Sequence, residues 1–385
     1  MKPLSGITVI DLSTVILGPY ASQILGDYGA RIIKIESPEG DSTRYTGPYN
    51  EMGMSAMFLG SNRNKESVVL NLKNNPDQQA LIELIKHADV FMHSMRPQKL
   101  KKLGIDPESL QKINPRLVYA GLQGFGFNGP YVGKPAYDDI IQGLSGSVAL
   151  MQEKISSPSY FPTIAADKTC ALYAAQAILA ALLGRERSGQ GCFVEIPMFE
   201  SMTAFNLVEN FYGQHFVPEK SKPGYPRVLD KSRKPYKTLD GYICMMPYTN
   251  THWQNFFKLA NAAELAHDER FINIANRTKN IQTLYQIVSD LIALESSSFW
   301  LTHCDRLEIP ASKVNQLDDL INDEHLKAIS FFKEIVDPQL GTLRFPNSPI
   351  SFNHVCAEIK IPPRLGEHTL KVLNEYGINT DFIKH

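Results

Sequence analysis

The sequence predicts an α/β protein built on a parallel sheet, together with a smaller α+β domain. Short runs rich in β-branched residues alternate with helical segments over the first 125 residues, which is typical of parallel strands joined by helical crossovers. The length of 385 residues accommodates two or three domains at roughly 150 residues each. The content of 43% hydrophobic and 21% charged residues is ordinary for a globular chain.

The elements of the first part follow in order along the chain. The predicted strands are Ile7–Leu12, Arg31–Glu36, Ser67–Leu72, Val90–His93, Leu117–Leu122 and Cys192–Ile196. The predicted helices are Pro19–Tyr28, Asp77–His87, Ala165–Gly184 and Phe199–Phe216. Pro19 suits a first helical turn, because its missing N–H would have no partner there in any case. The strands are short and β-branched, and the helix that begins at Ala165 is the longest helical segment.

The chain changes character after this part. Segment 218–237 contains four prolines and seven basic residues without a sustained period, which is typical of a boundary or an extended crossing segment. Gly241–Met246 and the helical segments through Asn280–Cys304 indicate a smaller α+β unit. A second irregular stretch, near Ile309–Val314, is expected to lead back to the first domain.

Charge and cysteine content exclude several classes of protein. With 39 Lys and Arg against 40 Asp and Glu, the net charge of -1 argues against a nucleic-acid partner. Five scattered cysteines without a C-x-x-C pair indicate neither a disulfide framework nor a metal site, and they suit a reducing compartment. The sequence shows no secretory signal, and the apolar stretch Thr169–Gly184 is shorter than the ~18 residues that span a bilayer. We therefore expect a cytoplasmic protein with no metal, no nucleic acid and no membrane among its partners.

One loop matches a known binding pattern without its required context. Gly124–Gly129 fits the G-x-G-x-x-G pattern of dinucleotide-binding loops and follows a predicted strand. Such a loop must open a helix, but Pro130, Gly133 and Pro135 come next. The pattern therefore favours a mobile or substrate-contacting loop over a dinucleotide site.

A basic cluster, Arg96–Lys102, follows the predicted strand that ends at His93, and Lys73 follows the one that ends at Leu72. Taken alone, such a cluster is interpreted as a solvated helix face. Ligands of open α/β sheets, however, bind beyond the carboxyl ends of the strands, where these residues should lie. Lys and Arg gathered there suit a ligand that carries more than one phosphate.

Asp167 stands at the head of the Ala-rich helix among small residues. Asp is a preferred N-cap, so this residue has a purely structural interpretation. A carboxylate at this place also suits a nucleophile, kept ionised by the helix N-terminus and left accessible by its small neighbours. The residue pattern alone does not choose between the two roles. Tyr137–Asp139 is interpreted as the cap of a helix that runs to about Ala149.

Taken in order, short motifs along essentially the whole chain resemble those of the class III CoA-transferases, the family of formyl-CoA transferase, carnitine CoA-transferase and α-methylacyl-CoA racemase. The matching segments are Leu4–Ser13, Gly18-Pro19, Asp27–Ala30, Ile33–Glu36, Asn62–Lys65, Asn71–Lys73, Arg96-Pro97, Leu103-Gly104, Gly124–Gly126, Ile178–Leu182 and Gly366–Thr369. Each motif is short, and it is their order along the chain that makes the resemblance specific.

The resemblance implies that Asp167 is the catalytic aspartate. Its carboxylate would attack a donor acyl-CoA thioester, giving a mixed anhydride and then an aspartyl-CoA thioester, from which a small carboxylic acid takes the CoA. Coenzyme A, as part of the acyl-CoA substrate, is the cofactor implied, and the acceptor acid stays open. The CoA-lining positions implied by the resemblance are Val15, Leu72, Lys73, Ser94, Met95, Arg96, Lys102 and Tyr137.

Departures from the family pattern bear on the activity. Relatives often carry Arg where Lys102 stands, and Ser94-Met95 replaces their usual Asn-Phe. Racemisation of an α-methylacyl-CoA, the first alternative, needs a base on each face of the α-carbon. Tyr137 stands at the position of the racemase histidine and Asn250 near that of its partnering glutamate, so transfer is favoured. A non-catalytic acyl-CoA-binding protein is the second alternative, against which the retained aspartate argues.

The resemblance also implies the architecture: a Rossmann-like large domain with a parallel sheet, a smaller α+β domain, and an interlocked-ring homodimer. Residues 1–215 are expected to form the N-terminal part of the large CoA-binding domain, 216–237 a linker and 238–305 the small domain. Residues 306–325 then form a second linker, and 326–385 return to the large domain. In the family, such linkers let two protomers thread through one another, so we expect an obligate homodimer with the active site between the chains.

Overall fold

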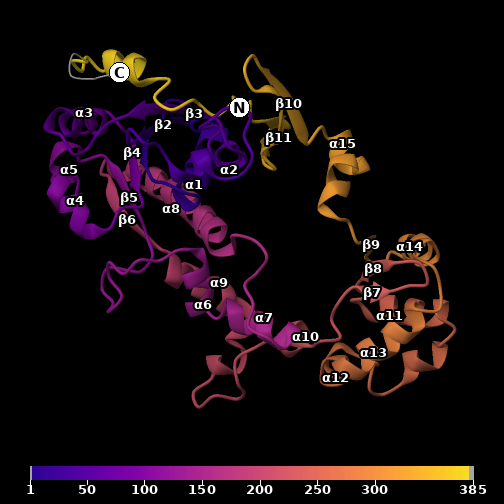
Figure 1. Cartoon of the computed structure of the whole chain (residues 1–385). Coiled ribbons are helices and arrows are strands. Elements are labelled where there is room, and N and C mark those ends of the chain that lie inside the picture. Colours follow the sequence, from indigo (N-terminus) through magenta and orange to yellow (C-terminus); the bar gives the residue numbers. More distant parts are fainter. Residues whose placement is uncertain (1, 381–385) are drawn as a thin grey trace. The chain divides into compact units, whose positions relative to one another are not determined.

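The structure, a computed structural model, describes residues 2–380. The chain divides into two compact units (Figure 1). The first unit contains the chain up to Ser145, Phe161–Phe205 and the chain from His325 onward, and the second contains Gly146–Tyr160 and Asn206–Glu324. The last five residues of the predicted C-terminal part, 381–385, lie outside the described residues.

A six-stranded parallel sheet forms the centre of the first unit. Its strands are β1 (Thr8–Leu12), β2 (Arg31–Glu36), β3 (Lys65–Val69), β4 (Val90–His93), β5 (Val118–Gln123) and β6 (Cys192–Pro197). They lie in the order β3-β2-β1-β4-β5-β6, and each neighbouring pair is parallel. Central residues such as Val9, Ile10 and Ile33 are fully buried, as expected for a parallel sheet with helices on both faces. The predicted α/β fold with a parallel sheet is therefore confirmed.

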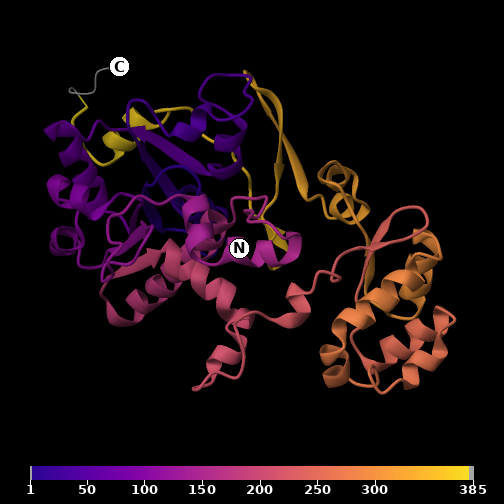
Figure 2. The ribbon, with the colours of Figure 1, turned by 60° about the horizontal axis from the view of Figure 1, so that its bottom comes forward.

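Two sets of helices cover the two faces of this sheet (Figures 1 and 2). One hydrophobic core includes α1 (Leu17–Asp27) and α8 (Ala165–Ser188), and the other includes α3 (Asn75–Lys86), α4 (Pro97–Leu103), α5 (Pro107–Ile113) and α16 (Thr369–Glu375). Helix α8 buries a row of small side chains that includes Ala166, Ala171 and Ala174. Because these side chains are short, the backbone of α8 packs closely against α1 and the sheet.

Helix α8 is longer than predicted. It continues past Gly184 to Ser188 and ends where Gly189 adopts a left-handed conformation with φ of 74°. Within residues 2–380 it is the one helix whose length and composition suffice to cross a membrane, whereas the sequence pattern placed it below that limit. Buried core helices of globular proteins pass the same test, and α8 contributes its small residues to the core of the first unit.

Two other helices end earlier than predicted. Helix α6 (Asp138–Leu144) stops before Ala149 because Gly146 adopts a φ of 88° ahead of α7 (Ser147–Ile155). Helix α9 (Met198–Asn210) stops before residue 216 and is followed by the short helix η2 (Tyr212–His215). The loop Gly124–Gly129 opens no helix, as predicted, since α6 is the next element after β5.

Arginine side chains fix the C-terminal part of the first unit to its N-terminal part. The fully buried Arg44 pairs with Glu36 at 2.7 Å and donates to the carbonyl oxygen of Pro363 at 3.2 Å. Arg364 pairs with Glu51 at 2.8 Å. The remaining elements of this unit are η1 (Ser42–Tyr45), α2 (Ala56–Ser61), the antiparallel hairpin β10 (Phe332–Asp337) and β11 (Gly341–Pro346), β12 (Ser351–Phe352) and β13 (Val355–Cys356).

The second unit has its own aromatic core, in which Trp253, Phe256 and Trp300 are buried. Its antiparallel sheet consists of β7 (Tyr236–Lys237), β8 (Tyr242–Met245) and β9 (Ala311–Lys313). Its other helical elements are α10 (Pro226–Leu229), α11 (Asn250–Leu259), η3 (Ala263–His267), α12 (Ile274–Lys279), α13 (Ile281–Ile292), α14 (Ser297–Arg306) and η4 (Leu317–Asn322), and α15 (Glu324–Ala328) begins at its last residue.

Helix α7 belongs to the second unit, whereas the sequence pattern placed it in the large domain. The ammonium group of Lys154 on α7 donates hydrogen bonds to the carbonyl oxygens of Val228, Asp230 and Arg233. These contacts join residues 74 to 79 positions apart in the sequence, so no local pattern predicts them. The second unit therefore includes Gly146–Tyr160, and its longer segment begins at Asn206, ahead of the proline-rich segment 218–237.

Replacing Arg44 by Met is expected to lower the free energy of unfolding by about 3–5 kcal/mol, because the buried carboxylate of Glu36 then loses its ion pair. Chemical denaturation followed by circular dichroism measures the change. Arg344→Met is the matched control: Arg344 pairs with Glu334 at 2.6 Å, but their side chains are 47% and 55% exposed. The control should lose less than about 1 kcal/mol, and equal losses in the two variants would contradict the explanation.

Candidate functional site

Two adjoining cavities open at the carboxyl edge of the sheet. We call them the aspartate cavity, of about 220 Å³, which contains Asp167, and the lysine cavity, of about 500 Å³, which contains Lys73 and Lys102. Thr14 and Met95 line both. The loops after β1 and β4 carry these two residues, and the chain order of the sheet reverses between these strands. Such a switch point is where open α/β sheets bind their ligands.

A larger cavity, of about 850 Å³, lies at the opposite edge, near the amino ends of β2 and β3. Its Arg31 pairs with Glu375 at 2.5 Å, and its Lys371 pairs with Glu66 at 3.0 Å. These charges are engaged with one another and hold α16 to the sheet. The smaller pair of cavities is therefore the better candidate, because the predicted functional residues lie there.

The structure brings together every residue that the sequence assigned to the site. The aspartate cavity is lined by Asp167, Val15, Ser94, Met95, Arg96 and Tyr137. The lysine cavity is lined by Leu72, Lys73, Met95 and Lys102. The residues come from loops after four different strands and from α4 and α8, so the carboxyl edge of the sheet is what collects them.

Asp167 is the third residue of α8 and is 8% exposed. Ile164 is the N-cap of this helix and makes no side-chain capping bond, so the structural interpretation of Asp167 as an N-cap is wrong. Burial, followed by the nearby charge of Asp138, raises the pKa of the Asp167 carboxyl to about 7. The sequence predicted that the helix N-terminus keeps this group ionised, and burial opposes that effect.

Asp138 is a site residue that the sequence analysis treated only as part of a helix cap. Its carboxylate accepts a hydrogen bond from the backbone N–H of Asp167 at 3.0 Å and another from the Gln142 amide at 2.6 Å. Gln142 in turn accepts from the N–H of Phe161 at 2.8 Å. The start of α6 therefore holds the start of α8 in place. Two adjacent aspartates at a helix start were the available signal, but their partner is 29 residues away.

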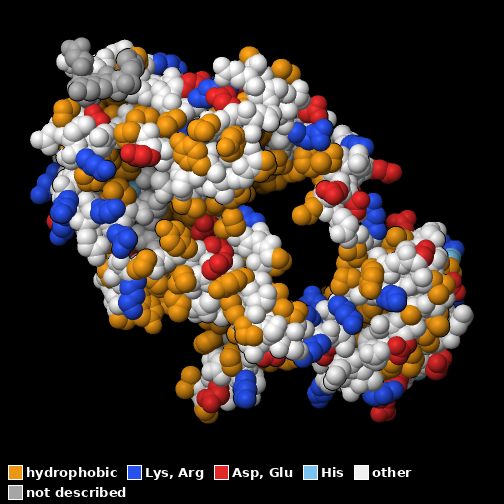
Figure 3. All heavy atoms as spheres, viewed as in Figure 1, with side chains coloured by type: hydrophobic (Ala, Val, Ile, Leu, Met, Phe, Trp, Pro, Cys, Tyr) orange, Lys and Arg blue, Asp and Glu red, His pale blue; other side chains and the backbone are white. Residues whose placement is uncertain are grey.

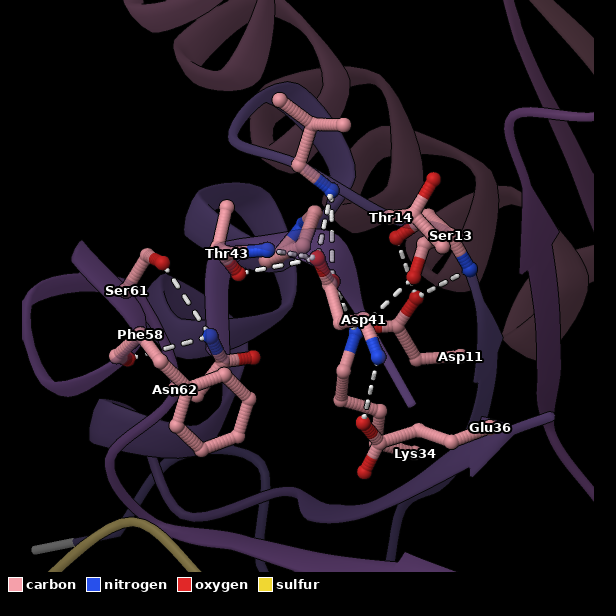
Figure 4. Close-up of polar contacts among 12 residues, drawn as sticks. Asp11, Ser13, Thr14, Lys34, Glu36, Asp41, Thr43, Phe58, Ser61 and Asn62 are labelled. Atoms are coloured by element: carbon pink, nitrogen blue, oxygen red, sulfur yellow. Dashed lines mark hydrogen bonds and ion pairs between the residues drawn. The ribbon is translucent and has the colours of Figure 1, made fainter. Parts of the chain in front are cut away.

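A strained loop forms the wall between the two cavities. Val15 has a φ of 72°, which is unfavourable for a β-branched residue, and its N–H donates to the carboxylate of Asp41 at 3.2 Å. Lys34 pairs with Asp41 at 2.9 Å and also donates to the carbonyl oxygen of Ser13 at 2.9 Å (Figure 4). A Cβ at Gly18 would lie 2.0 Å from the hydroxyl of Ser13, so only Gly fits beside the loop.

The same loop is anchored on its other side by Asp11 at the end of β1. The carboxylate of Asp11 accepts hydrogen bonds from the N–H and the hydroxyl of Ser13 (Figure 4). It also accepts one from the hydroxyl of Ser22 at 2.5 Å. Lys65 approaches Asp11 at 3.5 Å, and burial lowers the pKa of its ammonium group to about 7. The loop after β1 is therefore fixed on both sides by buried polar groups.

The lysine cavity combines an apolar floor with a basic rim. Its apolar residues include Ile35, Leu70 and Leu103, and its rim carries Lys73, Lys102 and also Lys99, which the sequence assigned only to the basic cluster. Glu36 and Asp41 line it too, but they are engaged by Arg44 and Lys34. Figure 3 shows Lys and Arg side chains gathered over the region of α4 and α5. An apolar floor with lysines beside it suits a purine nucleotide, whose ring packs against apolar side chains and whose phosphates pair with the lysines.

Comparison with protein families identifies the class. The sequence model of the family described as CoA-transferase family III matches residues 4–369. The chain therefore belongs to the class III CoA-transferases. It is an enzyme, and the general reaction of its family is the transfer of CoA from an acyl-CoA to a carboxylic acid.

Two similar curated proteins are also named as CoA-transferases. Over 380 residues the chain is 31% identical to mouse succinyl-CoA:glutarate CoA-transferase, covering 97% of this chain and 86% of the mouse protein. Over 387 residues it is 33% identical to acetyl-CoA:oxalate CoA-transferase of Acetobacter aceti, covering 97% and 96%. The crystal structure of Rv3272 from Mycobacterium tuberculosis is also similar, with a TM-score of 0.83, 28% identity and coverage of 96% and 98%. So is that of a CAIB/BAIF family protein from Brucella suis, with a TM-score of 0.79 and 29% identity over 97% and 99%.

Asp138→Asn is expected to lower the pKa of Asp167 from about 7, because the variant keeps an oxygen for the Asp167 N–H and removes the neighbouring negative charge. At pH 6 a drop of one unit would raise the ionised fraction by roughly fivefold. Carbon-13 NMR of labelled aspartate carboxyls measures the titration. Asp139→Asn removes an exposed neighbouring carboxylate and should leave the titration where it is. An unchanged titration in Asp138→Asn would rule out this coupling.

Proposed function

We propose that this enzyme transfers CoA from an acyl-CoA thioester to a small carboxylic acid, with Asp167 as the covalent nucleophile. The observation that carries the proposal is the position of this carboxylate. It is buried in a cavity that adjoins the basic lysine cavity, so a CoA whose nucleotide lies among the lysines has its thioester end directed towards Asp167.

The reaction proceeds by successive acyl transfers that conserve the thioester energy. The Asp167 carboxylate attacks the carbonyl carbon of the donor thioester, the C–S bond breaks, and a mixed anhydride and the CoA thiolate form. The thiolate then attacks the aspartyl carbonyl, releasing the donor acid and leaving an aspartyl-CoA thioester. The acceptor carboxylate attacks this thioester, giving a second anhydride and the thiolate. Attack of the thiolate on the acceptor carbonyl forms the new acyl-CoA and restores the carboxylate.

The protonation state of Asp167 suits this chemistry. Only the carboxylate attacks a thioester, and with a pKa of about 7 roughly half of the group is ionised at neutral pH. The buried site solvates the carboxylate only weakly, and this makes it more basic than an exposed carboxylate. We therefore expect the rate of anhydride formation to fall as the pH drops below 7.

The donor and acceptor are proposed to be small carboxylic acids, as in the names of the mouse and Acetobacter relatives. The aspartate cavity has a volume of only about 220 Å³, which suits short acids rather than long acyl chains. Its Arg96 and Lys134 provide positive charge for a carboxylate.

Loss of the nucleophile tests the proposal. Asp167→Ala is expected to lower the rate of CoA transfer by on the order of 10⁴-fold or more, as for other enzymes that lose a covalent nucleophile. Intact-mass spectrometry should find an aspartyl adduct in the wild-type protein, and hydroxylamine should trap it at Asp167. Asp139→Ala, which removes an exposed carboxylate near the site, is the control and should retain the adduct.

Other outcomes separate the alternatives. Exchange of the α-hydrogen of the acyl group for deuterium, without transfer, would indicate racemisation. Retained CoA binding with neither reaction would indicate an acyl-CoA-binding protein. A hydroxylamine-trapped adduct at another residue would overturn the assignment of Asp167.

We also propose that the enzyme works as an interlocked homodimer in the cytoplasm. Support comes from α8, which leaves Leu172 49% exposed and Leu183 56% exposed on the side away from the core, and from β6, where Phe193 is 41% exposed. Apolar side chains gathered on one element are typical of a protein interface. The five cysteines are all free, which suits a reducing compartment.

Light scattering coupled to size-exclusion chromatography is expected to give twice the chain mass of 43.2 kDa. The double variant Leu172→Glu/Leu183→Glu should prevent the chains from assembling into the dimer, because it places charges in the apolar interface. Ile113→Glu on α5, where Ile113 is 38% exposed, is the matched control and should stay dimeric. A monomeric wild-type protein with full activity would contradict the proposed assembly.

A further inference from the structure

Gln123 is a buried amide without a partner in the aspartate cavity. It is the last residue of β5, is 8% exposed, and lines the cavity together with Asp167. Its side-chain nitrogen is buried and has no hydrogen-bond partner among the described residues. An unsatisfied buried donor costs about 1–3 kcal/mol, so an amide retained in such a place needs an explanation.

His93 presents a second unpaired donor close by. It is the last residue of β4 and is fully buried. Its Nδ1 accepts the N–H of Met95 at 3.1 Å, so the proton of the neutral ring is on Nε2, and this atom also has no partner within residues 2–380. Burial lowers the pKa of His93 to about 3, which keeps the ring neutral at any pH at which the protein works.

The register of the sheet places these two side chains side by side. His93 lies opposite Gly121 in the pairing of β4 with β5, and Gln123 is two residues further along the same face. Gly121 has no side chain, and a Cβ there would lie 3.6 Å from Nε2 of His93. Neighbouring strands lie about 4.8 Å apart and two residues advance about 6.6 Å along a parallel strand, so the backbones of His93 and Gln123 are about 8 Å apart, which a Gln side chain spans.

An arrangement of the amide satisfies both groups. A half turn of the Gln123 amide about its last bond exchanges its oxygen and nitrogen, and would offer Nε2–H of His93 an acceptor in place of a donor. Its NH₂ group would then be left to donate into the aspartate cavity, which Gln123 lines. A hydrogen-bond acceptor supplied by the substrate completes the set, and the thioester and anhydrides that react with Asp167 each carry one in their carbonyl oxygen.

We propose that Gln123 donates a hydrogen bond to the carbonyl oxygen of the acyl group that reacts with Asp167, and that His93 is the positioning residue that orients the Gln123 amide. This inference deepens the proposed function and rests on it. Negative charge develops on that oxygen each time a carboxylate or thiolate adds to the carbonyl carbon, and a fixed donor stabilises it. Gln123 forms no covalent bond and transfers no proton.

The inference has a kinetic and a structural signature. Gln123→Met keeps the shape of the side chain and removes its donors, so kcat is expected to fall by about 10²–10³-fold with a much smaller change in the KM for acyl-CoA. The melting temperature should change little, because the variant removes a buried unpaired NH₂ group but leaves Nε2–H of His93 without its acceptor. The control is Gln23→Met: Gln23 is 2% exposed, but its amide oxygen accepts the N–H of Arg63 at 3.1 Å. This control should lower the melting temperature and leave kcat near the wild-type value.

Variants of His93 test the positioning role. His93→Phe removes the Nε2–H and should lower kcat without moving the pH profile, since the ring is neutral in the native enzyme. His93→Gln restores a donor near the Nε2 position and should recover part of kcat. Equal kcat values in these two variants would rule out orientation through Nε2.

A spectroscopic test does not depend on turnover. In the Asp167→Ala background, the infrared carbonyl band of a carbon-13-labelled acyl-CoA should shift to lower frequency on binding. The shift should disappear in Asp167→Ala/Gln123→Met, or in Asp167→Ala/Gln123→Leu if the Met variant does not fold. An identical band with and without Gln123 overturns the inference, as does wild-type kcat in Gln123→Met. An inactive wild-type enzyme whose bound acyl-CoA still shows the shift would instead overturn the proposed function.

Discussion

The site depends on the buried ion pair between Lys34 and Asp41. Both side chains are fully inaccessible, and together they hold the carbonyl oxygen of Ser13 and the N–H of Val15. A buried pair of this kind adds little net stability, because desolvation of two charges offsets most of their attraction. Its effect is to fix one loop conformation, including the unfavourable φ of Val15. The wall shared by the two cavities therefore has a single shape before any ligand binds.

Polar groups buried at the aspartate cavity lower the free energy of unfolding at neutral pH. The pKa of Asp167 is raised in the folded chain to about 7 from an ordinary value near 3.8, so its protonated form is favoured by folding. The resulting stability is fully present below about pH 4 and is lost as the pH rises through about 7. At neutral pH the enzyme thus holds a partly ionised carboxylate that would be better solvated in the unfolded chain. Unpaired donors on His93 and Gln123 add to this cost at the same edge.

Local sequence patterns were sufficient to predict an element whose structure depends mainly on its own residues. Runs of β-branched residues gave the six strands, and prolines after Gly129 excluded a dinucleotide-binding helix. Helix ends were less predictable, because they depend on single glycines such as Gly146 and Gly189 with positive φ. The boundary of the second unit depended on Lys154, whose partners are more than seventy residues away. No periodicity contains that information.

The sequence by itself determined which residue types stand after the strands, and this was enough to place Arg96 and the lysines at one edge of the sheet, whereas Asp167 was named through the resemblance to the family. The reason is topological: parallel strands end at one edge, so residues that follow different strands must meet there. Only the tertiary structure decided how the site works. The contact of Asp138 with Asp167 and the juxtaposition of Gln123 with His93 arise from the packing of α6 on α8 and from the register of β4 on β5. Both contacts join residues far apart in the sequence. They depend on how whole helix and sheet faces are buried against one another, which no local motif specifies.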